Sequence, residues 1–269
     1  MKYAHTQYVH LANKIVMDII KYFDIDTDKK EMISVVGGGG KTTTIFNLAY
    51  ELKKLNKSVL VTTTTAIYNP NIELYDNIVI EENNDSIEAS WPKGTITVFG
   101  ISISAENKIL GVKDSFLDYI FSKNIFDVIL VEADGSKKKP IKAPASHEPV
   151  IPSKTTSVIG VIGMDSLGKN IDDTNVHRPE IFCQVTKSTT NDIITEEIIS
   201  SLIVSELGLF KGTPIESKKY LLLNKADTEF LMNKARLIGK TIKNEGYSTN
   251  GVLAGSMAQK KIRNIWRRC

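Results

Sequence analysis

The sequence predicts an α/β fold built on a mostly parallel sheet with helices on both faces. Three observations lead to this expectation. A short apolar run ends in four glycines, a lysine and three threonines, MISVVGGGGKTTT, at 32–44. Strand-like apolar segments alternate with amphipathic helical segments, which favours parallel pairing. Polar residues follow two of the apolar runs, at 132–135 (EADG) and 224–227 (NKAD). Together these features predict the P-loop NTPase class of α/β folds.

The glycine-rich segment has the composition of a phosphate-binding loop. A backbone passes close to phosphate oxygens only where side chains are absent, so glycines at 37–40 let successive N–H groups face one concavity. Lys41 can then reach the β- and γ-phosphates, and Thr42 can offer its hydroxyl to Mg²⁺. Val35 occupies the position of the usual first glycine, and a glycine-rich turn without a ligand is the alternative. The predicted phosphate-binding residues are Gly37, Gly38, Gly39, Gly40, Lys41, Thr42, Thr43 and Gly135.

The remaining elements follow from hydrophobic spacing. A helix begins at Thr43, because apolar residues recur at helical spacing after it and place the phosphates at a helix N-terminus. The unbroken apolar centre of DVILVEADG predicts a strand buried on both faces. Further strands are expected at 58–65, 77–82, 94–104, 127–135, 156–168, 218–227 and 251–256, and further helices at 8–23, 116–124, 195–210 and 228–246. The basic tail at 260–269 is read as a solvated helix face.

Length and composition indicate a globular protein with a buried core. The 269 residues divide into an N-terminal helical segment at 1–30 and a P-loop nucleotide-binding domain at 31–269. A hydrophobic content of 42% with 24% charged residues is ordinary for such a domain, and the net charge of +3 does not argue for nucleic acid.

Cysteine use and hydropathy predict a cytoplasmic protein. Cys183 and Cys269 form no C-x-x-C pair, so neither a disulfide framework nor a thiolate metal site is expected. Charged residues interrupt the apolar stretch at 8–23, which is therefore no signal segment. No run approaches the ~18 apolar residues of a membrane span. We expect no membrane association.

The segment at 132–135 predicts a magnesium site. In nucleotide hydrolases, an acidic residue at such a strand end holds Mg²⁺, and a glycine three residues later meets the γ-phosphate. The predicted Mg²⁺ ligands are therefore Thr42 and Glu132, and Gly135 is the γ-phosphate contact. Asp134 is a second carboxylate, able to orient the attacking water or to hold a partner. A polar turn after a core strand is the alternative.

Four threonines at 62–65 end another predicted strand beside the phosphates. Their hydroxyls can meet Mg²⁺ or the γ-phosphate, although threonine also favours strands for its shape alone. From these segments, the predicted catalytic residues are Lys41, Asp134 and Thr64.

The segment at 224–227 predicts a guanine site. The Asp227 carboxylate, which we expect to be buried, can accept two hydrogen bonds from guanine N1–H and its 2-amino group, whereas adenine would leave the buried carboxylate unpaired. Asn224 can bond the base edge, and the Lys225 stem can cover the ring face. Ser256, in GVLAGS, completes the predicted base-binding set of Asn224, Lys225, Asp227 and Ser256. GTP is therefore expected in preference to ATP.

With these segments in place, the sequence resembles the selenium-dependent hydroxylase accessory protein family, called YqeC. The resemblance runs from about Val36 to Asp227 and rests on GGGGKTT, VLVTTTT-IY, EADGSK, PIKAPASHEPVIP, VIGVIGMDSLGK, HRPE and LLLNKAD. It implies a role in maturing molybdenum hydroxylases that carry selenium, with such an enzyme or its molybdopterin as a partner. The sequence is also similar to GTPases of metallocentre assembly, which implies a dimerising GTPase. Without a Cys-Pro-His motif, nickel handling is not implied.

Two further segments predict a second-substrate site. The proline-containing stretch at 137–149 follows the magnesium strand directly, and its side chains can meet an anionic substrate such as a molybdopterin. For Lys138 and Lys139 a solvated loop is preferred. In HRPE, the Arg178 guanidinium can bind phosphate or can pair with Glu180. The predicted residues are Lys142, His147, Glu148 and Arg178.

The sequence therefore predicts a Mg²⁺-dependent nucleotide hydrolase that uses GTP and assists assembly of a molybdenum enzyme. An ATP-dependent ligase resembling the Mur ligases is one alternative, since their loop also reads G-x-x-G-K-T-T. A nucleotide-sensing scaffold with negligible turnover is the other.

Overall fold

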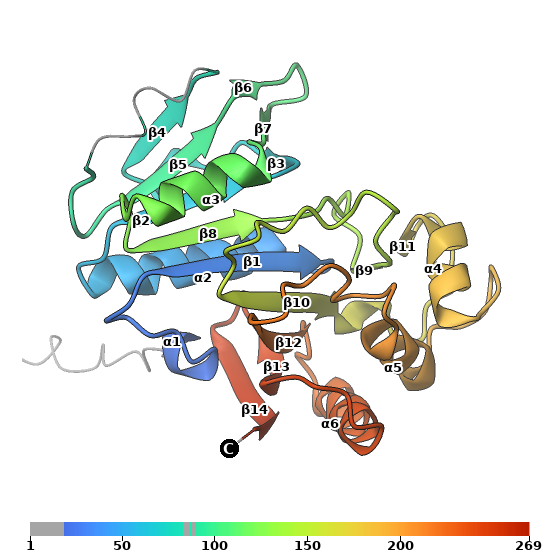
Figure 1. The fold of residues 1–269 in the computed structure, drawn as a ribbon. Helices are drawn as coiled ribbons and strands as arrows, with labels where there is room; N and C mark the ends of the chain where they lie inside the picture. Colours follow the sequence, from blue (N-terminus) through green and yellow to red (C-terminus); the bar gives the residue numbers. More distant parts are fainter. Residues whose placement is uncertain (1–18, 83–86, 88–89, 269) are drawn as a thin grey trace, which may run out of the picture.

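A computed structural model describes residues 19–82, 87 and 90–268, and its centre is one large sheet (Figure 1). All neighbouring strands are parallel except for the last pair, β13 and β14. The predicted mostly parallel sheet is thereby confirmed. Within the described residues, nine strands follow the spatial order β14 (Lys261–Arg267), β13 (Gly251–Ser256), β12 (Lys218–Asn224), β10 (Ser157–Gly163), β1 (Glu31–Gly37), β8 (Val128–Glu132), β2 (Val59–Thr63), β5 (Ile96–Gly100) and β4 (Asn77–Ile80).

Helices cover both faces of the sheet because successive strand residues point to opposite sides. On β1, Ile33 and Val35 join the core that contains buried residues of α1 and α2, whereas Met32 and Val36 join cores on the other face with residues of α3 and α5. Helix α6 packs with α5 on that second face. The helices are α1 (Ile19–Tyr22), α2 (Lys41–Lys54), α3 (Asp114–Ser122), α4 (Pro179–Thr186), α5 (Glu196–Val204) and α6 (Glu229–Asn244), with 3₁₀ turns η1 (Ile72–Leu74) and η3 (Met164–Ser166).

The three predicted motifs meet at the carboxyl edge of the sheet. Strand β1 lies between β8 and β10, with Val35 opposite Glu132, and β12 pairs with β10 so that Asn224 lies opposite Gly163. Two small sheets extend this edge. One pairs β9 (Ile141–Lys142) with β11 (Val176–His177), and the other has the order β3 (Ala66–Tyr68), β7 (Lys108–Leu110) and β6 (Ser102–Ile103).

Several expectations at the element level differ from the structure. The tail at 261–267 is the antiparallel strand β14 rather than a helix face, because its backbone pairs with β13 and the Trp266 indole donates to the Gly239 carbonyl. The helix expected at 195–210 ends at Val204, and α4 was not predicted. Residues 8–18 of the predicted N-terminal helix lie outside the described residues. No described helix combines the length and apolarity needed to cross a membrane.

Candidate functional site

The glycine loop between β1 and α2 has a conformation that only glycine adopts readily. Gly37, Gly39 and Gly40 have φ of 94°, 79° and 128°, all in the left-handed region. A Cβ on Gly37 would lie 2.3 Å from the Val161 carbonyl oxygen, so the loop also lies too close to β10 for a side chain. No side chain of the described residues caps the N-terminus of α2. Its first N–H groups are therefore free to serve an anion.

Lys41, Thr42 and Glu132 form a contact group at the mouth of this loop. The Lys41 ammonium donates to the Gly37 carbonyl at 2.7 Å and lies 3.7 Å from Glu132 Oε1. The Thr42 hydroxyl donates to Glu132 Oε2 at 2.8 Å. Burial acts to lower the pKa of Lys41, but the Asp134 and Glu132 carboxylates outweigh it and raise that pKa, so the ammonium stays charged.

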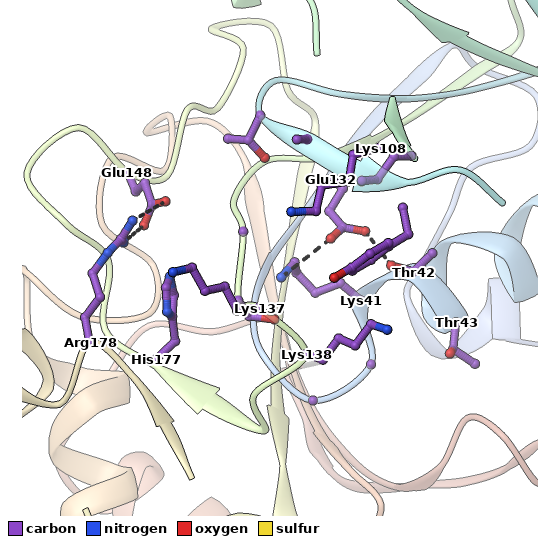
Figure 2. Close-up of a pocket in the computed structure, with 18 of the residues that line it drawn as sticks. Lys41, Thr42, Thr43, Lys108, Glu132, Lys137, Lys138, Glu148, His177 and Arg178 are labelled. Carbon is purple, nitrogen blue, oxygen red and sulfur yellow. Dashed lines mark hydrogen bonds and ion pairs between the residues drawn. The ribbon is translucent and has the colours of Figure 1, made fainter. Parts of the chain in front are cut away.

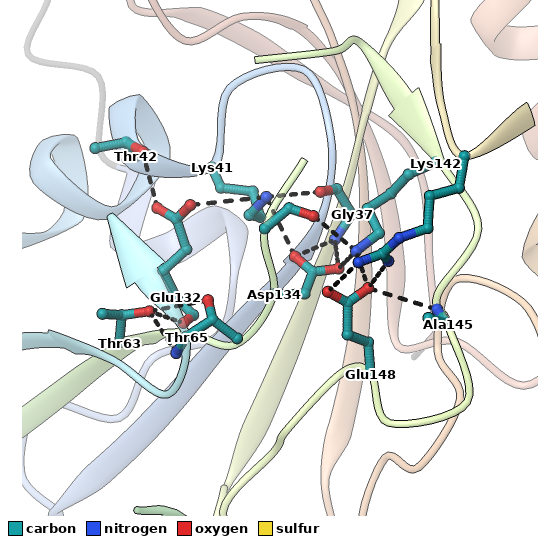
Figure 3. Close-up of polar contacts among 12 residues, drawn as sticks. Gly37, Lys41, Thr42, Thr63, Thr65, Glu132, Asp134, Lys142, Ala145 and Glu148 are labelled. Atoms are coloured by element: carbon teal, nitrogen blue, oxygen red, sulfur yellow. Dashed lines mark hydrogen bonds and ion pairs between the residues drawn. The ribbon is translucent and has the colours of Figure 1, made fainter. Parts of the chain in front are cut away.

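A row of alternating charges continues from Lys41 away from α2 (Figure 3). Asp134 Oδ1 lies 3.2 Å from the Lys41 ammonium, and Asp134 Oδ2 lies 3.1 Å from that of Lys142. Lys142 donates to Glu148 Oε2 at 2.6 Å, and Arg178 holds both oxygens of Glu148 at 2.5 and 3.3 Å. Burial acts to raise the pKa of Glu148, but Arg178 and Lys142 lower it to about 2. The row, which we call the charge ladder, consists of Lys41, Asp134, Lys142, Glu148 and Arg178, and so alternates three cations with two carboxylates.

A cavity of about 520 Å³ opens above the loop and continues past Glu132 (Figure 2). Figure 2 shows the Lys41 group on one side, Arg178, Glu148 and His177 on the other, and Lys137 and Lys138 between them. Burial, reinforced by Arg178 and Lys142, lowers the pKa of His177 to about 4, so its imidazole is neutral at neutral pH. The lining residues are Gly39, Gly40, Lys41, Thr42, Thr43, Thr65, Ala66, Ile67, Tyr68, Lys108, Glu132, Gly135, Ser136, Lys137, Lys138, Glu148, His177, Arg178 and Lys225.

The predicted base-binding residues lie on the opposite side of β1 from Glu132. Buried Asn224 donates to the Gly39 carbonyl at 2.8 Å and accepts from the Met257 N–H at 2.9 Å, so it braces the glycine loop. Lys225 reaches the cavity edge and pairs with Asp165 at 2.7 Å. Asp227 is exposed, so the expectation of a buried carboxylate is wrong, and Ser256 is buried. Neither of these two residues lines the cavity described above.

The predicted catalytic residues have different positions. Lys41 lines the cavity, whereas Asp134 lies beneath the loop and accepts from the Gly37 N–H at 3.1 Å. Asp134 therefore contacts other residues of the chain, and this geometry favours a role in holding them over a role in orienting water. The Thr64 hydroxyl donates to the Val150 carbonyl at 2.7 Å, and its neighbour Thr65 lines the cavity instead.

Of the four predicted second-substrate residues, two line the cavity and two do not. Arg178 and Glu148 line the cavity, and Arg178 pairs with Glu148 rather than with Glu180. Lys142 is buried inside the charge ladder, and His147 is exposed and lies outside the cavity wall. Sequence reasoning did not select Tyr68, Lys108, Lys137 or Lys138. The lysine run at 137–139 is a visible signal, but a solvated loop was preferred for Lys138 and Lys139, and Lys137 was given no role.

The hydroxyl of Thr42 and the carboxylate of Glu132 are oxygen ligands of a kind that Mg²⁺ accepts. Within the described residues, no group of three histidine, cysteine or acidic side chains could hold a metal by itself. Mg²⁺ needs fewer protein ligands, because it keeps waters and shares phosphate oxygens with one or two protein oxygens. The Thr42 hydroxyl and the Glu132 carboxylate provide two such oxygens at the end of the glycine loop.

Comparison with known proteins identifies the family. The family model described as YqeC protein matches residues 33–180, a span that contains the glycine loop and the charge ladder. YqeC of Escherichia coli (strain K12) is 32% identical over 203 residues, which cover 75% of this chain and 79% of that protein. The chain therefore belongs to the YqeC family.

Proposed function

We propose that the protein is a Mg²⁺-dependent P-loop nucleoside triphosphatase that uses GTP. The observation that carries the proposal is the group of Lys41, Thr42 and Glu132 at the end of β1 and β8, beside three left-handed glycines and an uncapped helix N-terminus. Backbone N–H groups, one ammonium and a hydroxyl–carboxylate pair are the parts that phosphoryl transfer needs.

The residues of the chain account for binding and charge stabilisation. The glycine loop would surround the β-phosphate with N–H groups, and Lys41 would stabilise charge developing on the β- and γ-phosphate oxygens. Mg²⁺, held by Thr42 and Glu132, would supply further neutralisation of the phosphate oxygens. Gly135, whose Cα faces open space, would present its N–H to the γ-phosphate. Thr65, in the cavity wall, is better positioned than Thr64 to contact the attacking water.

The preference for GTP rests on the segment at 224–227. Asp227 is exposed at the end of β12, and its carboxylate can accept from both guanine donors. The resemblance noted above supports a role in maturing selenium-containing molybdenum hydroxylases in the cytoplasm, with that enzyme or its molybdopterin as partner. A homodimer is part of the same proposal.

Calorimetric titration with GDP, GTP, ADP and ATP, each with Mg²⁺, tests nucleotide choice, and phosphate release tests turnover. We expect tight guanine binding, little adenine binding and measurable GTP hydrolysis. Adenine preference would favour the ligase alternative. Tight binding without steady-state turnover would favour the scaffold.

Three variants assign these results to the site. Lys41→Ala should abolish turnover, whereas Lys54→Ala, an exposed lysine of the same helix, should leave it unchanged. Asp227→Asn should weaken the binding of GTP and allow the binding of xanthosine triphosphate, because the 2-oxo group of xanthine would accept from the new amide donor. Unchanged affinities for both nucleotides in Asp227→Asn would remove the guanine assignment.

A further inference from the structure

The cavity extends from the glycine loop to Tyr68 and Lys108. Strand order puts the base-reading segment after β12 on one side of β1, and puts β8 and β2 on the other. The cavity follows the second side, past Glu132 and Gly135 to Tyr68 and Lys108 in the small β3–β7 sheet. A nucleotide with its phosphates on the glycine loop and its base near Asp227 therefore leaves the Tyr68 end open.

Tyr68 presents an aromatic ring at this end of the cavity. Its side chain is 48% exposed, although it belongs to a strand that is paired to β7. The Lys138 ammonium lies 4.2 Å from the ring centroid, and that of Lys108 lies 5.3 Å from it. Such cation–π contacts are weak at an exposed site, so a ligand can displace the ammonium groups from the ring.

The ring is held in a fixed position relative to the glycine loop. Gly111, which follows β7, donates to the Thr65 carbonyl at 2.8 Å, and a Cβ there would lie 2.4 Å from the Thr63 carbonyl oxygen. The small sheet is therefore hydrogen-bonded to, and closely packed against, the residues at the end of β2. We call this small sheet, with the ring of Tyr68, the Tyr68 platform. Because β2 pairs with β8, the Tyr68 platform and Glu132 belong to one continuous framework.

Positive charge is in excess between the two sides of the cavity, where Figure 2 places Lys137 and Lys138. Glu148 is neutralised within the charge ladder, Glu132 by Lys41, and Glu106 by Lys108. Lys137 and Lys138 have left-handed φ of 46° and 63°, and no carboxylate of the described residues lies within salt-bridge distance of either ammonium. These two lysines are therefore available to an anion that enters the cavity.

We propose that the Tyr68 end of the cavity binds a second ligand, an anion that carries a flat aromatic ring system. The ring would stack on Tyr68, and the charged group would meet Lys137 and Lys138. Only the placement of this ligand beside the terminal phosphate rests on the proposed function, since the ring and the lysines belong to the cavity whether or not GTP binds.

Flavin mononucleotide is a suitable probe, because it combines a flat ring with a phosphate and its fluorescence reports stacking. Riboflavin, with the ring alone, and ribose 5-phosphate, with the phosphate alone, are its matched controls. We expect the protein to bind flavin mononucleotide at least about tenfold more tightly than either control, because both contacts contribute.

Variants assign the probe to this end of the cavity. Tyr68→Ala should weaken the binding of flavin mononucleotide about tenfold, and Tyr68→Phe should retain most of the affinity. Lys138→Gln should weaken the binding of flavin mononucleotide but leave the binding of riboflavin unchanged. Tyr50→Ala is the matched control, since Tyr50 is 46% exposed and lies beneath the ammonium groups of Lys54 and Lys260 on the outer side of α2.

The outcomes separate this inference from the proposed nucleotide site. Flavin binding that persists with saturating Mg²⁺-GDP supports a second ligand beside the nucleotide. Flavin binding without any guanine binding would remove the GTPase proposal and leave the second ligand in place. Absence of flavin binding, equal binding in Tyr68→Ala, or full displacement by Mg²⁺-GDP would overturn the inference.

Discussion

Replacing Glu148 by glutamine should destabilise the protein because it removes the carboxylate that lies between Lys142 and Arg178 in the charge ladder. Glu148 is 6% exposed and holds two cations, buried Lys142 and the 30%-exposed Arg178. Its pKa falls from 4.5 to about 2, and at 1.36 kcal/mol per unit this corresponds to about 3 kcal/mol. Water screens Arg178 in part, so about 2 kcal/mol is the expected loss in the free energy of unfolding at neutral pH.

The pH dependence of this loss follows from the direction of the shift. A carboxylate with a depressed folded-state pKa contributes in full above its ordinary pKa of 4.5, and the contribution disappears as the pH falls through about 2. The difference between the wild-type protein and Glu148→Gln should therefore shrink from about 2 kcal/mol near neutral pH to about 1 kcal/mol or less near pH ~3.

Urea unfolding of both proteins at the two pH values measures this difference. Glu206→Gln, which alters an exposed carboxylate beyond the end of α5, is the control and should match the wild type at both pH values. A Glu148→Gln protein as stable as the wild type near neutral pH would refute the reasoning. So would a loss that stays the same size in acid, because a contribution from the ionised carboxylate must titrate.

Three further substitutions test the glycine loop and its supports. Gly40→Ala should lower the free energy of unfolding by about 1–3 kcal/mol and should reduce nucleotide affinity. The reason is that φ of Gly40 is 128° and that the new Cβ would lie 2.3 Å from Asn224 Nδ2. Calorimetry measures both the stability and the affinity. Asn224→Ala should cost about 1–3 kcal/mol in urea unfolding, because the Gly39 carbonyl and one buried N–H lose their partner. Thr42→Val should raise the Mg²⁺ concentration for half-maximal GTP turnover by at least about tenfold, and an unchanged requirement would separate Thr42 from the metal.

The central sheet and the glycine loop were predictable because their signals are long and local. Unbroken apolar runs such as 128–132 mark strands buried on both faces, and four successive glycines have few other uses. Where the chain carries weaker signals, prediction failed. The strand β14 has one lysine and two arginines at exposed positions, and its pairing with β13 determines its conformation.

The charge ladder and the Tyr68 platform were not predictable as assemblies. Lys142 and Arg178 come together because β9 and β11 pair over two residues each, which is too short to leave a periodic pattern. Tyr68 meets Lys108 through β3 and β7, which have three residues each. Residue type indicated charged candidates, but tertiary contacts decide whether a lysine such as Lys142 is buried in an ion pair or open to a ligand.

The central position of β1 also has a consequence for biosynthesis. Its hydrogen-bonding neighbours lie far along the chain, with contacts 97 residues away on the β8 side and 124 residues away on the β10 side. At about 5–20 residues per second, the ribosome needs on the order of 5–25 s after making β1 to supply both neighbours. The glycine loop therefore acquires its binding shape late in synthesis, and a nascent chain gains phosphate affinity only after more than half of the protein has emerged.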